Sequence, residues 1–182
     1  MINDIESVLL SEEQIDQITT KIAKEIDKDY ADRDRKLLLL GILKGSVVFM
    51  SDLMKKIKRP VEIDFMKVSS YGAGTETSGK INIILDLHRT DLSELDIIII
   101  EDIIDSGKTL SYLVEYLKLG GARSVKTCTL LDKPSRRQVD FVPTYTGTEI
   151  PDEFVVGYGL DFAEQYRTLP FVGVLKPEVY EK

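Results

Sequence analysis

The chain has 182 residues, and its 24 Lys and Arg against 31 Asp and Glu give a formal net charge of −7. Hydrophobic residues make up 43% and charged residues 30%, which excludes a disordered or fibrous chain and predicts a single globular domain over residues 1–182. The acidic balance argues against a nucleic-acid-binding surface, because affinity for a phosphate backbone comes mainly from clustered Lys and Arg.

The first predicted elements are a helix, a strand and a tight turn. Residues 11–28 carry isoleucines at helical spacing, and Ser11 with Gln14 matches a capping box at the start of that helix. The apolar run at 37–43 predicts a strand, and Lys44-Gly45-Ser46 predicts the tight turn that follows it.

A second helix and two further strands flank a long polar loop. Residues 47–58 return to helical spacing, and residues 61–68 alternate apolar with charged side chains as a strand does. Residues 69–80 have neither period nor apolar content, and a strand-like run resumes at 81–87. A loop of about a dozen residues is long enough to suggest function or mobility, and we interpret it as a lid over a site.

The most apolar short segment, Ile97–Ile100, predicts a central strand that is buried on both faces. A helix with one apolar side follows at 110–117, and Gly120-Gly121 is expected to end it with a left-handed cap. The alternation of strands and helices predicts an α/β fold with a mostly parallel central sheet flanked by helices. The remaining predicted strands are 125–131, 154–158 and 171–175.

The segment 101–109 joins the central strand to its helix, at the edge where open parallel sheets bind ligands. Asp105-Ser106-Gly107-Lys108-Thr109 leads into the helix, so free backbone N–H groups and two hydroxyls can hold a phosphate there. Glu101 and Asp102 would repel that phosphate unless ribose hydroxyls or a divalent cation lay between them. A solvated acidic turn without function is the alternative.

Other phosphate-binding motifs do not fit. Gly107-Lys108-Thr109 is similar to the end of a P-loop, but that motif needs Gly where Asp102 stands. Gly72-Ala73-Gly74 and Gly157-Tyr158-Gly159 both lack the third Gly of a dinucleotide-binding fingerprint.

Residues 97–110 resemble the phosphoribosyl-diphosphate-binding signature of type I phosphoribosyltransferases. The rest of the chain is similar to their hypoxanthine-guanine branch, although Ser46 and Ser106 stand where some members have Gly and Thr. The resemblance implies the fold of that family, with a small hood lobe built from the terminal segments. The motifs that carry it are 43–46, Ser70-Tyr71, Asp132-Lys133, 154–161 and 164–167.

The resemblance implies transfer of 5-phosphoribose from phosphoribosyl diphosphate to hypoxanthine or guanine, which gives the nucleotide and diphosphate. Asp105, Ser106, Gly107, Lys108 and Thr109 would hold the 5′-phosphate. Glu101 and Asp102 would hold the ribose hydroxyls directly or through Mg²⁺, with Asp161 as a third metal ligand. Mg²⁺ suits such a site because it keeps waters and binds phosphate oxygens with few carboxylates.

The same resemblance assigns the chemistry and the diphosphate site. Asp105 would be the general base that takes, or hydrogen-bonds, the proton on purine N7; a helix N-cap is its alternative role. Lys44, Gly45 and Arg167 would bind the diphosphate. A cis peptide bond between Leu43 and Lys44 is also implied.

The purine would stack on Phe154, with the Val155 backbone and Lys133 at its edge and Ile103 lining the pocket. An ammonium has three donors and no acceptor, so Lys133 would favour a 6-oxo group over an amino group. Asp161 could alternatively accept from an exocyclic amine. Ser70 and Tyr71 would be the working residues of the lid.

Two alternatives stay open: a nucleic-acid-binding regulator that senses phosphoribosyl diphosphate, and a sibling transferase for xanthine or a pyrimidine. The net charge of −7 counts against the regulator. A lone Cys128, an acidic N-terminus and apolar runs far shorter than the ~20 residues of a membrane span predict a cytoplasmic protein without membrane contact. The resemblance implies a homodimer or homotetramer.

Overall fold

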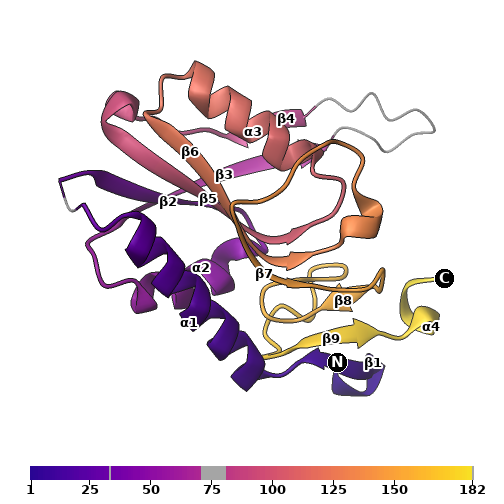
Figure 1. Cartoon of the computed structure of the whole chain (residues 1–182). Helices are drawn as coiled ribbons and strands as arrows, with labels where there is room; N and C mark the ends of the chain where they lie inside the picture. The colour runs from indigo at the N-terminus through magenta and orange to yellow at the C-terminus, as the bar shows by residue number, and fades with distance from the viewer. Residues whose placement is uncertain (33, 71–80, 182) are drawn as a thin grey trace.

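A six-stranded sheet in the order β4-β3-β2-β5-β6-β7 forms the centre of the molecule (Figure 1). The computed structural model describes residues 1–32, 34–70 and 81–181. All neighbouring strands of this sheet are parallel except β3 and β4, which confirms the predicted mostly parallel sheet. The strands are β2 (Lys36–Ile42), β3 (Glu62–Ser70), β4 (Ile81–Leu85), β5 (Leu95–Ile104), β6 (Ser124–Asp132) and β7 (Tyr145–Glu149).

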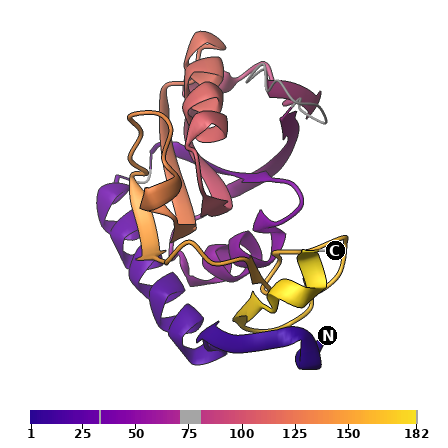
Figure 2. The ribbon, with the colours of Figure 1, turned by 90° about the vertical axis from the view of Figure 1, so that its right-hand side faces the viewer.

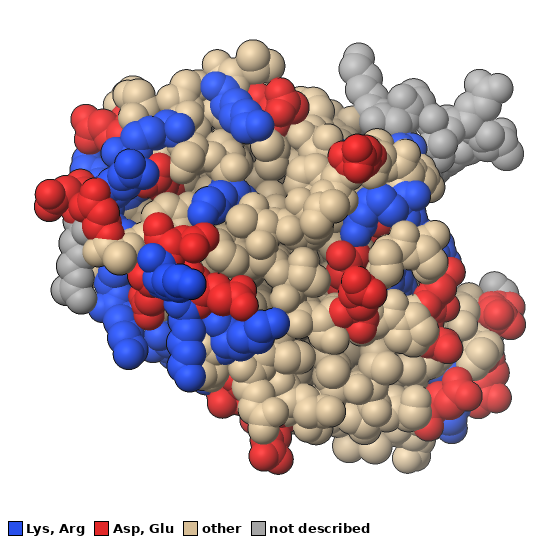
Figure 3. Space-filling model, in the orientation of Figure 1, with Lys and Arg blue, Asp and Glu red and all other residues tan. Residues whose placement is uncertain are grey.

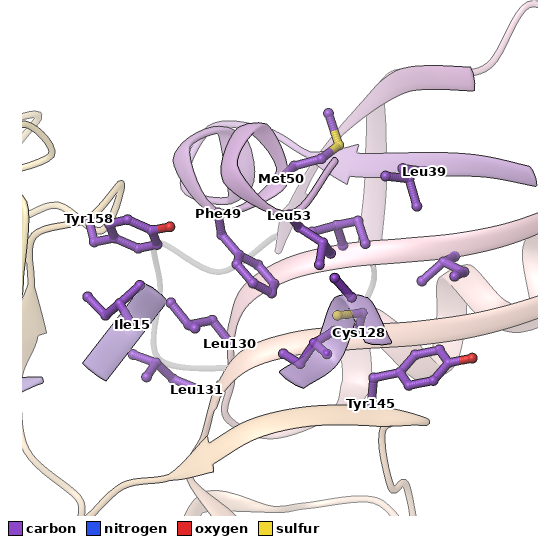
Figure 4. Packing of buried hydrophobic residues seen from close by; sticks show 14 of the residues in the cluster. Ile15, Leu39, Phe49, Met50, Leu53, Cys128, Leu130, Leu131, Tyr145 and Tyr158 are labelled. Atoms are coloured by element: carbon purple, nitrogen blue, oxygen red, sulfur yellow. The ribbon is translucent and has the colours of Figure 1, made fainter. Parts of the chain in front are cut away.

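Helices cover both faces of this sheet, and the alternating side chains of β5 explain why. Ile98 and Ile100 belong to the core shared with α1 (Glu12–Asp29) and α2 (Ser46–Lys56), whereas Ile97 and Ile99 pack toward α3 (Lys108–Leu119). Figure 4 shows Phe49 of α2 in the first of these cores. The continuous apolar run therefore marks a strand buried on both faces, as predicted.

Local signals at the helix ends have the predicted effects. The Ser11 side chain accepts from the Gln14 N–H at 3.2 Å, and the Gln14 side chain accepts from the Ser11 N–H at 2.8 Å, which completes the capping box. At the end of α3, the left-handed residue is Gly121, with φ 93°, rather than Gly120. Its N–H donates to the Lys118 carbonyl, and the next N–H donates to the Leu117 carbonyl, which is a Schellman cap.

A second, three-stranded antiparallel sheet in the order β1-β9-β8 forms the hood (Figures 1 and 2). It brings the two ends of the chain together, since β1 pairs with β9 along its length. The expected hood lobe from the terminal segments is therefore present. Its elements are β1 (Ile5–Leu10), β8 (Val155–Val156), β9 (Val172–Leu175) and the short helix α4 (Pro177–Tyr180).

Some boundaries differ from the prediction. The strand predicted at 154–158 is reduced to Val155–Val156, so Phe154 lies just outside it. β5 continues through Ile104, so Glu101 and Asp102 lie within the strand rather than after it. No helix in the described ranges is long and apolar enough to span a membrane.

Candidate active site

The segments that follow β2, β5 and β6 meet at one edge of the central sheet, because these strands are parallel. Two backbone hydrogen bonds hold the loop after β5 to the segment after β6: the Lys133 N–H donates to the Ile104 carbonyl and the Gln138 N–H to the Ser106 carbonyl, both at 2.9 Å. In Figure 3, acidic side chains gather on the right-hand side, where the central sheet and the hood meet. The predicted site residues thus come from distant parts of the chain to one edge.

The predicted phosphate site is a small cavity of about 120 Å³ at the start of α3. Gly107 is the N-cap of this helix, with φ 80°, and a Cβ there would lie 3.0 Å from Arg137 Cδ. Glycine therefore suits both the backbone conformation and the space. The cavity is lined by Glu101, Ile103, Ile104, Asp105, Ser106, Gly107, Thr109 and Leu110, and the Lys108 N–H donates to Ser106 Oγ at 3.3 Å.

Asp105 is not the helix N-cap, so the alternative role considered for it is wrong. Gly107 takes that position, two residues later, and the Asp105 side chain is 51% exposed. One carboxylate oxygen, Asp105 Oδ1, lies 4.0 Å from Lys133 Nζ. The carboxylate predicted to be the base is thus accessible and lies beside the lysine predicted to contact the purine.

Glu101 and Asp102 point to opposite faces of β5, as consecutive strand residues do. Glu101 lines the phosphate cavity, its Oε2 is buried without a hydrogen-bond partner among the described residues, and burial raises its pKa well above the usual value. Asp102 lies against the turn after β2, where a Cβ on Gly45 would come within 1.6 Å of its Oδ2. Burial also raises the pKa of Asp102 to about 6.

The predicted diphosphate residues lie where this turn meets the hood. The peptide bond between Leu43 and Lys44 is cis, as the resemblance implies. Lys44 Nζ lies 3.0 Å from the Glu164 carboxylate, and Arg167 lies 2.9 Å from Asp161 Oδ1. In this structure, therefore, both predicted cations pair with acids of the hood loop.

That loop has an unusual backbone. Tyr158, Ala163, Glu164 and Tyr166 all have positive φ although none is glycine. Gly159 allows the closest approach: a Cβ there would lie 2.2 Å from the Gly45 carbonyl oxygen. Strained backbone of this kind clusters at ligand sites, which fits the predicted diphosphate contact.

The predicted purine residues lie in different segments: Lys133 follows β6 and Phe154 precedes β8, whereas Ile103 lines the small cavity at the start of α3. Lys133 is buried, with its Nζ 4.0 Å from acids on two sides, Asp105 and Asp152. Phe154 keeps 38% of its surface exposed, unlike a core aromatic, and Val155 is buried in β8. Phe154 is therefore available to stack on a ligand.

The predicted metal ligands do not form one cluster. Asp161 pairs with Arg167 and accepts from the Glu164 N–H at 2.9 Å, while Glu101 and Asp102 face apart. Within residues 1–32, 34–70 and 81–181, no three Asp, Glu, His or Cys side chains could hold a metal ion by themselves. The expected three-carboxylate set is thus not assembled from protein groups alone.

Part of the predicted lid lies outside the description. Ser70 ends β3, and Tyr71 belongs to the residues that the structure does not describe. Its role as a lid residue stays a prediction.

Arg137 lies at the site although no sequence pattern predicted it. Its guanidinium donates to the Asp105 carbonyl at 2.7 Å and to Asp132 Oδ1 at 2.5 Å, and so joins the loop after β5 to the end of β6. No local pattern distinguishes it from the exposed Arg136 beside it. Only the pairing of β5 with β6 could have indicated this role.

Known proteins of one family are similar to this chain in sequence and fold. The family model of the phosphoribosyl transferase domain matches residues 7–163. The hypoxanthine-guanine phosphoribosyltransferase of Bacillus subtilis (strain 168) is 54% identical over 181 residues, which cover 100% of this chain and 99% of that protein. A crystal structure of a hypoxanthine phosphoribosyltransferase from Staphylococcus aureus has a TM-score of 0.94 at 49% identity and covers 100% of this chain and 97% of that one.

Longer relatives also match. The bifunctional protein TilS/HprT of Listeria monocytogenes (serotype 4b) is 50% identical over 182 residues. The match covers 100% of this chain, which spans only 28% of the length of that relative. With the family model, the full-length relatives and the shared fold in agreement, the chain belongs to the phosphoribosyltransferase family, in its hypoxanthine-guanine branch.

Proposed function

We propose that this protein transfers 5-phosphoribose from phosphoribosyl diphosphate to hypoxanthine or guanine in purine salvage, with release of diphosphate. The name of the Bacillus subtilis relative, 54% identical along the whole chain, supports this activity. The observation that carries the proposal is the combination of a small cavity at the start of α3, two partly buried acids in β5 and an exposed aromatic ring beside β8.

The phosphate cavity and the two acids would bind the phosphoribosyl group. The backbone N–H groups at the start of α3 would donate to the 5′-phosphate, and the helix dipole favours a negative charge there. Glu101 and Asp102 would accept from the ribose hydroxyls. A hydroxyl donor would give the buried Glu101 Oε2 the partner that it lacks among the described residues.

The diphosphate would bind beside the turn after β2, through backbone N–H groups of Lys44 and Gly45 and the guanidinium of Arg167. A planar guanidinium matches phosphate oxygens. The Lys44 and Arg167 pairs with Glu164 and Asp161 are partly exposed, so exchanging them for a diphosphate costs little.

In the reaction, one imidazole nitrogen of the purine forms a bond to the ribose C1′, and the bond from C1′ to the diphosphate oxygen breaks. The proton on N7 would pass to Asp105, or be held by it. Lys133 would donate to the 6-oxo group while Phe154 stacks on the ring. Because the transition state separates charge, the protein's main work is to orient the reactants and to stabilise the diphosphate.

Mg²⁺ is part of this proposal. Because Glu101 and Asp102 face apart, one of them would supply a carboxylate oxygen, and substrate oxygens and water would complete the shell of the cation. When bound, Mg²⁺ would neutralise charge on phosphoribosyl diphosphate. We further propose a cytoplasmic homodimer or homotetramer.

The decisive experiment incubates the purified protein with phosphoribosyl diphosphate, Mg²⁺ and each of hypoxanthine, guanine, xanthine, adenine and uracil. Nucleotide formation with the first two bases is the expected result. Activity with none of them, or only with adenine or uracil, would refute the proposal.

The base assignment has its own test. D105N keeps the shape of the side chain but removes its basicity, so kcat should fall by roughly 10²–10⁴ while the product GMP still binds. An unchanged kcat would exclude Asp105 as the base.

A further inference from the structure

The C-terminal helix α4 contacts the ring proposed to stack on the purine. The Tyr180 ring lies against Phe154, with centroids 4.7 Å apart and planes inclined by only 19°. Phe162 forms a T-shaped contact with the same ring, at 5.6 Å and 88°. The exposed ring of Phe154 is therefore stacked on one face by Tyr180 and contacts a second aromatic ring, Phe162.

Tyr180 is anchored rather than left on a loose tail. The Lys176 N–H donates to the Asp4 carbonyl at 3.0 Å, and Lys176 Nζ donates to the Asn3 carbonyl at 2.7 Å. These hydrogen bonds hold the start of α4 to the N-terminal segment. Val179 and Tyr180 both pack on the hood core. Figure 1 shows α4 beside the paired β1 and β9. The chain ends thus fix the position of the Tyr180 ring.

An aromatic ring has two faces on which another ring can stack. Tyr180 covers one face of Phe154, and 38% of the Phe154 surface stays exposed. A purine on the opposite face would complete a stack of three rings. The two aromatic neighbours, Tyr180 and Phe162, limit the rotamers that the Phe154 ring can adopt.

We propose that Tyr180 is a positioning residue for the purine, which holds the Phe154 ring in the orientation that stacks on the base. This inference rests on the proposed function and adds to it a residue from the far end of the chain. Tyr180 acts through Phe154 and does not contact the reacting atoms.

The first test compares Y180A and Y180F with E181A, which changes the exposed neighbouring residue as a matched control. An aromatic pair contributes enough that Y180A should raise KM for guanine about three- to tenfold, with KM for phosphoribosyl diphosphate unchanged. Y180F keeps the stack and should behave like the wild type, as should E181A. An unchanged KM for guanine in Y180A, or an equal rise in both KM values, would overturn the inference. A lower KM for guanine would also overturn it, since Tyr180 would then occupy the place of the base.

A second test uses fluorescence, because the chain contains no tryptophan. Y180W places a single tryptophan against Phe154, and GMP should change its emission whereas ribose 5-phosphate should not. No response at GMP concentrations that inhibit the same variant would contradict the stack. If the wild type forms neither IMP nor GMP, the proposed function itself fails. If the wild type is active and Y180A has the same KM for the base, only the role of Tyr180 is refuted.

Discussion

Replacing Asp102 by Asn should raise the stability of the protein and lower its activity. Asp102 lies in β5 against Gly45, and its Oδ1 accepts from the Ile103 N–H at 2.9 Å. The amide oxygen of Asn can keep this hydrogen bond and the shape of the side chain. What the substitution removes is a negative charge that burial disfavours.

The size of the effect follows from the pKa. Burial raises the pKa of Asp102 from 3.8 to about 6, despite the opposing charge of Arg167. Each pKa unit corresponds to about 1.4 kcal/mol, so the ionised carboxylate costs the folded state at most about 3 kcal/mol. Partial exposure of the side chain reduces this to roughly 1–2 kcal/mol.

The sign depends on pH. Between pH 3.8 and about 6 the folded protein holds a proton that the unfolded chain has lost, so the Asp102 contribution to stability falls as pH rises through this window. The destabilisation caused by ionised Asp102 reaches its full value above pH 6 and is about half as large at pH 5. D102N should therefore gain more stability at pH 8 than at pH 5.

Urea unfolding at both pH values measures this gain, with the exposed D140N as a control for general removal of charge. The D102N protein should also have a lower kcat/KM for phosphoribosyl diphosphate, because the carboxylate proposed to accept from the ribose hydroxyls is lost. A D102N protein no more stable than the wild type at pH 8, or a D140N protein that gains as much stability, would show that the Asp102 charge does not destabilise the fold.

Three further substitutions test other parts of the structure. R137A removes the donors to the Asp105 carbonyl and to Asp132, and should lower kcat about tenfold or more with R137K intermediate, as steady-state rates would show. G107A places a side chain on a residue with φ 80° and should lower the free energy of unfolding, measured with urea, by about 1–2 kcal/mol. It should also weaken the binding of phosphoribosyl diphosphate. Burial alone would raise the pKa of Asp96, but hydrogen bonds from Arg123 and Ser124 lower it, so its stabilisation is present above the ordinary value of 3.8 and lost as pH falls below it. D96N should therefore be less stable than the wild type at pH 7, by on the order of 2 kcal/mol, with the difference shrinking in thermal scans toward pH 3.

The central strands could be predicted because burial on both faces leaves a continuous apolar run, as in β5. Strand β7 could not: its sequence Tyr145-Thr146-Gly147-Thr148-Glu149 has no apolar alternation. Glycine stands within it because a Cβ on Gly147 would lie 2.3 Å from the Leu130 carbonyl oxygen. The need for glycine at this position comes from the neighbouring strand β6, so no pattern in the sequence around Gly147 indicates it.

The same distinction holds at the site. Gly107 and its phosphate cavity lie within one continuous motif, so their geometry could be expected from residues next to one another. Arg137 and Tyr180 act on residues 32 and 26 positions away, on the Asp105 carbonyl and the Phe154 ring. Such contacts depend on how strands pair and how the chain ends meet, which no spacing rule encodes.

The charged groups of the site are of two kinds, which differ in what a bound ligand would change: exposed ion pairs and a buried carboxyl oxygen. Lys44 and Glu164 form an ion pair with side chains 51% and 65% exposed, so breaking it costs little in water. Glu101 is the opposite case, since its carboxyl is buried and its Oε2 has no partner in the part of the chain that the structure describes. A ligand that brings phosphate to the cations and hydroxyls to the acids would thus break weak ion pairs and give a hydrogen-bond partner to a buried group, and under the proposed function this difference would contribute binding energy that positions the reactants.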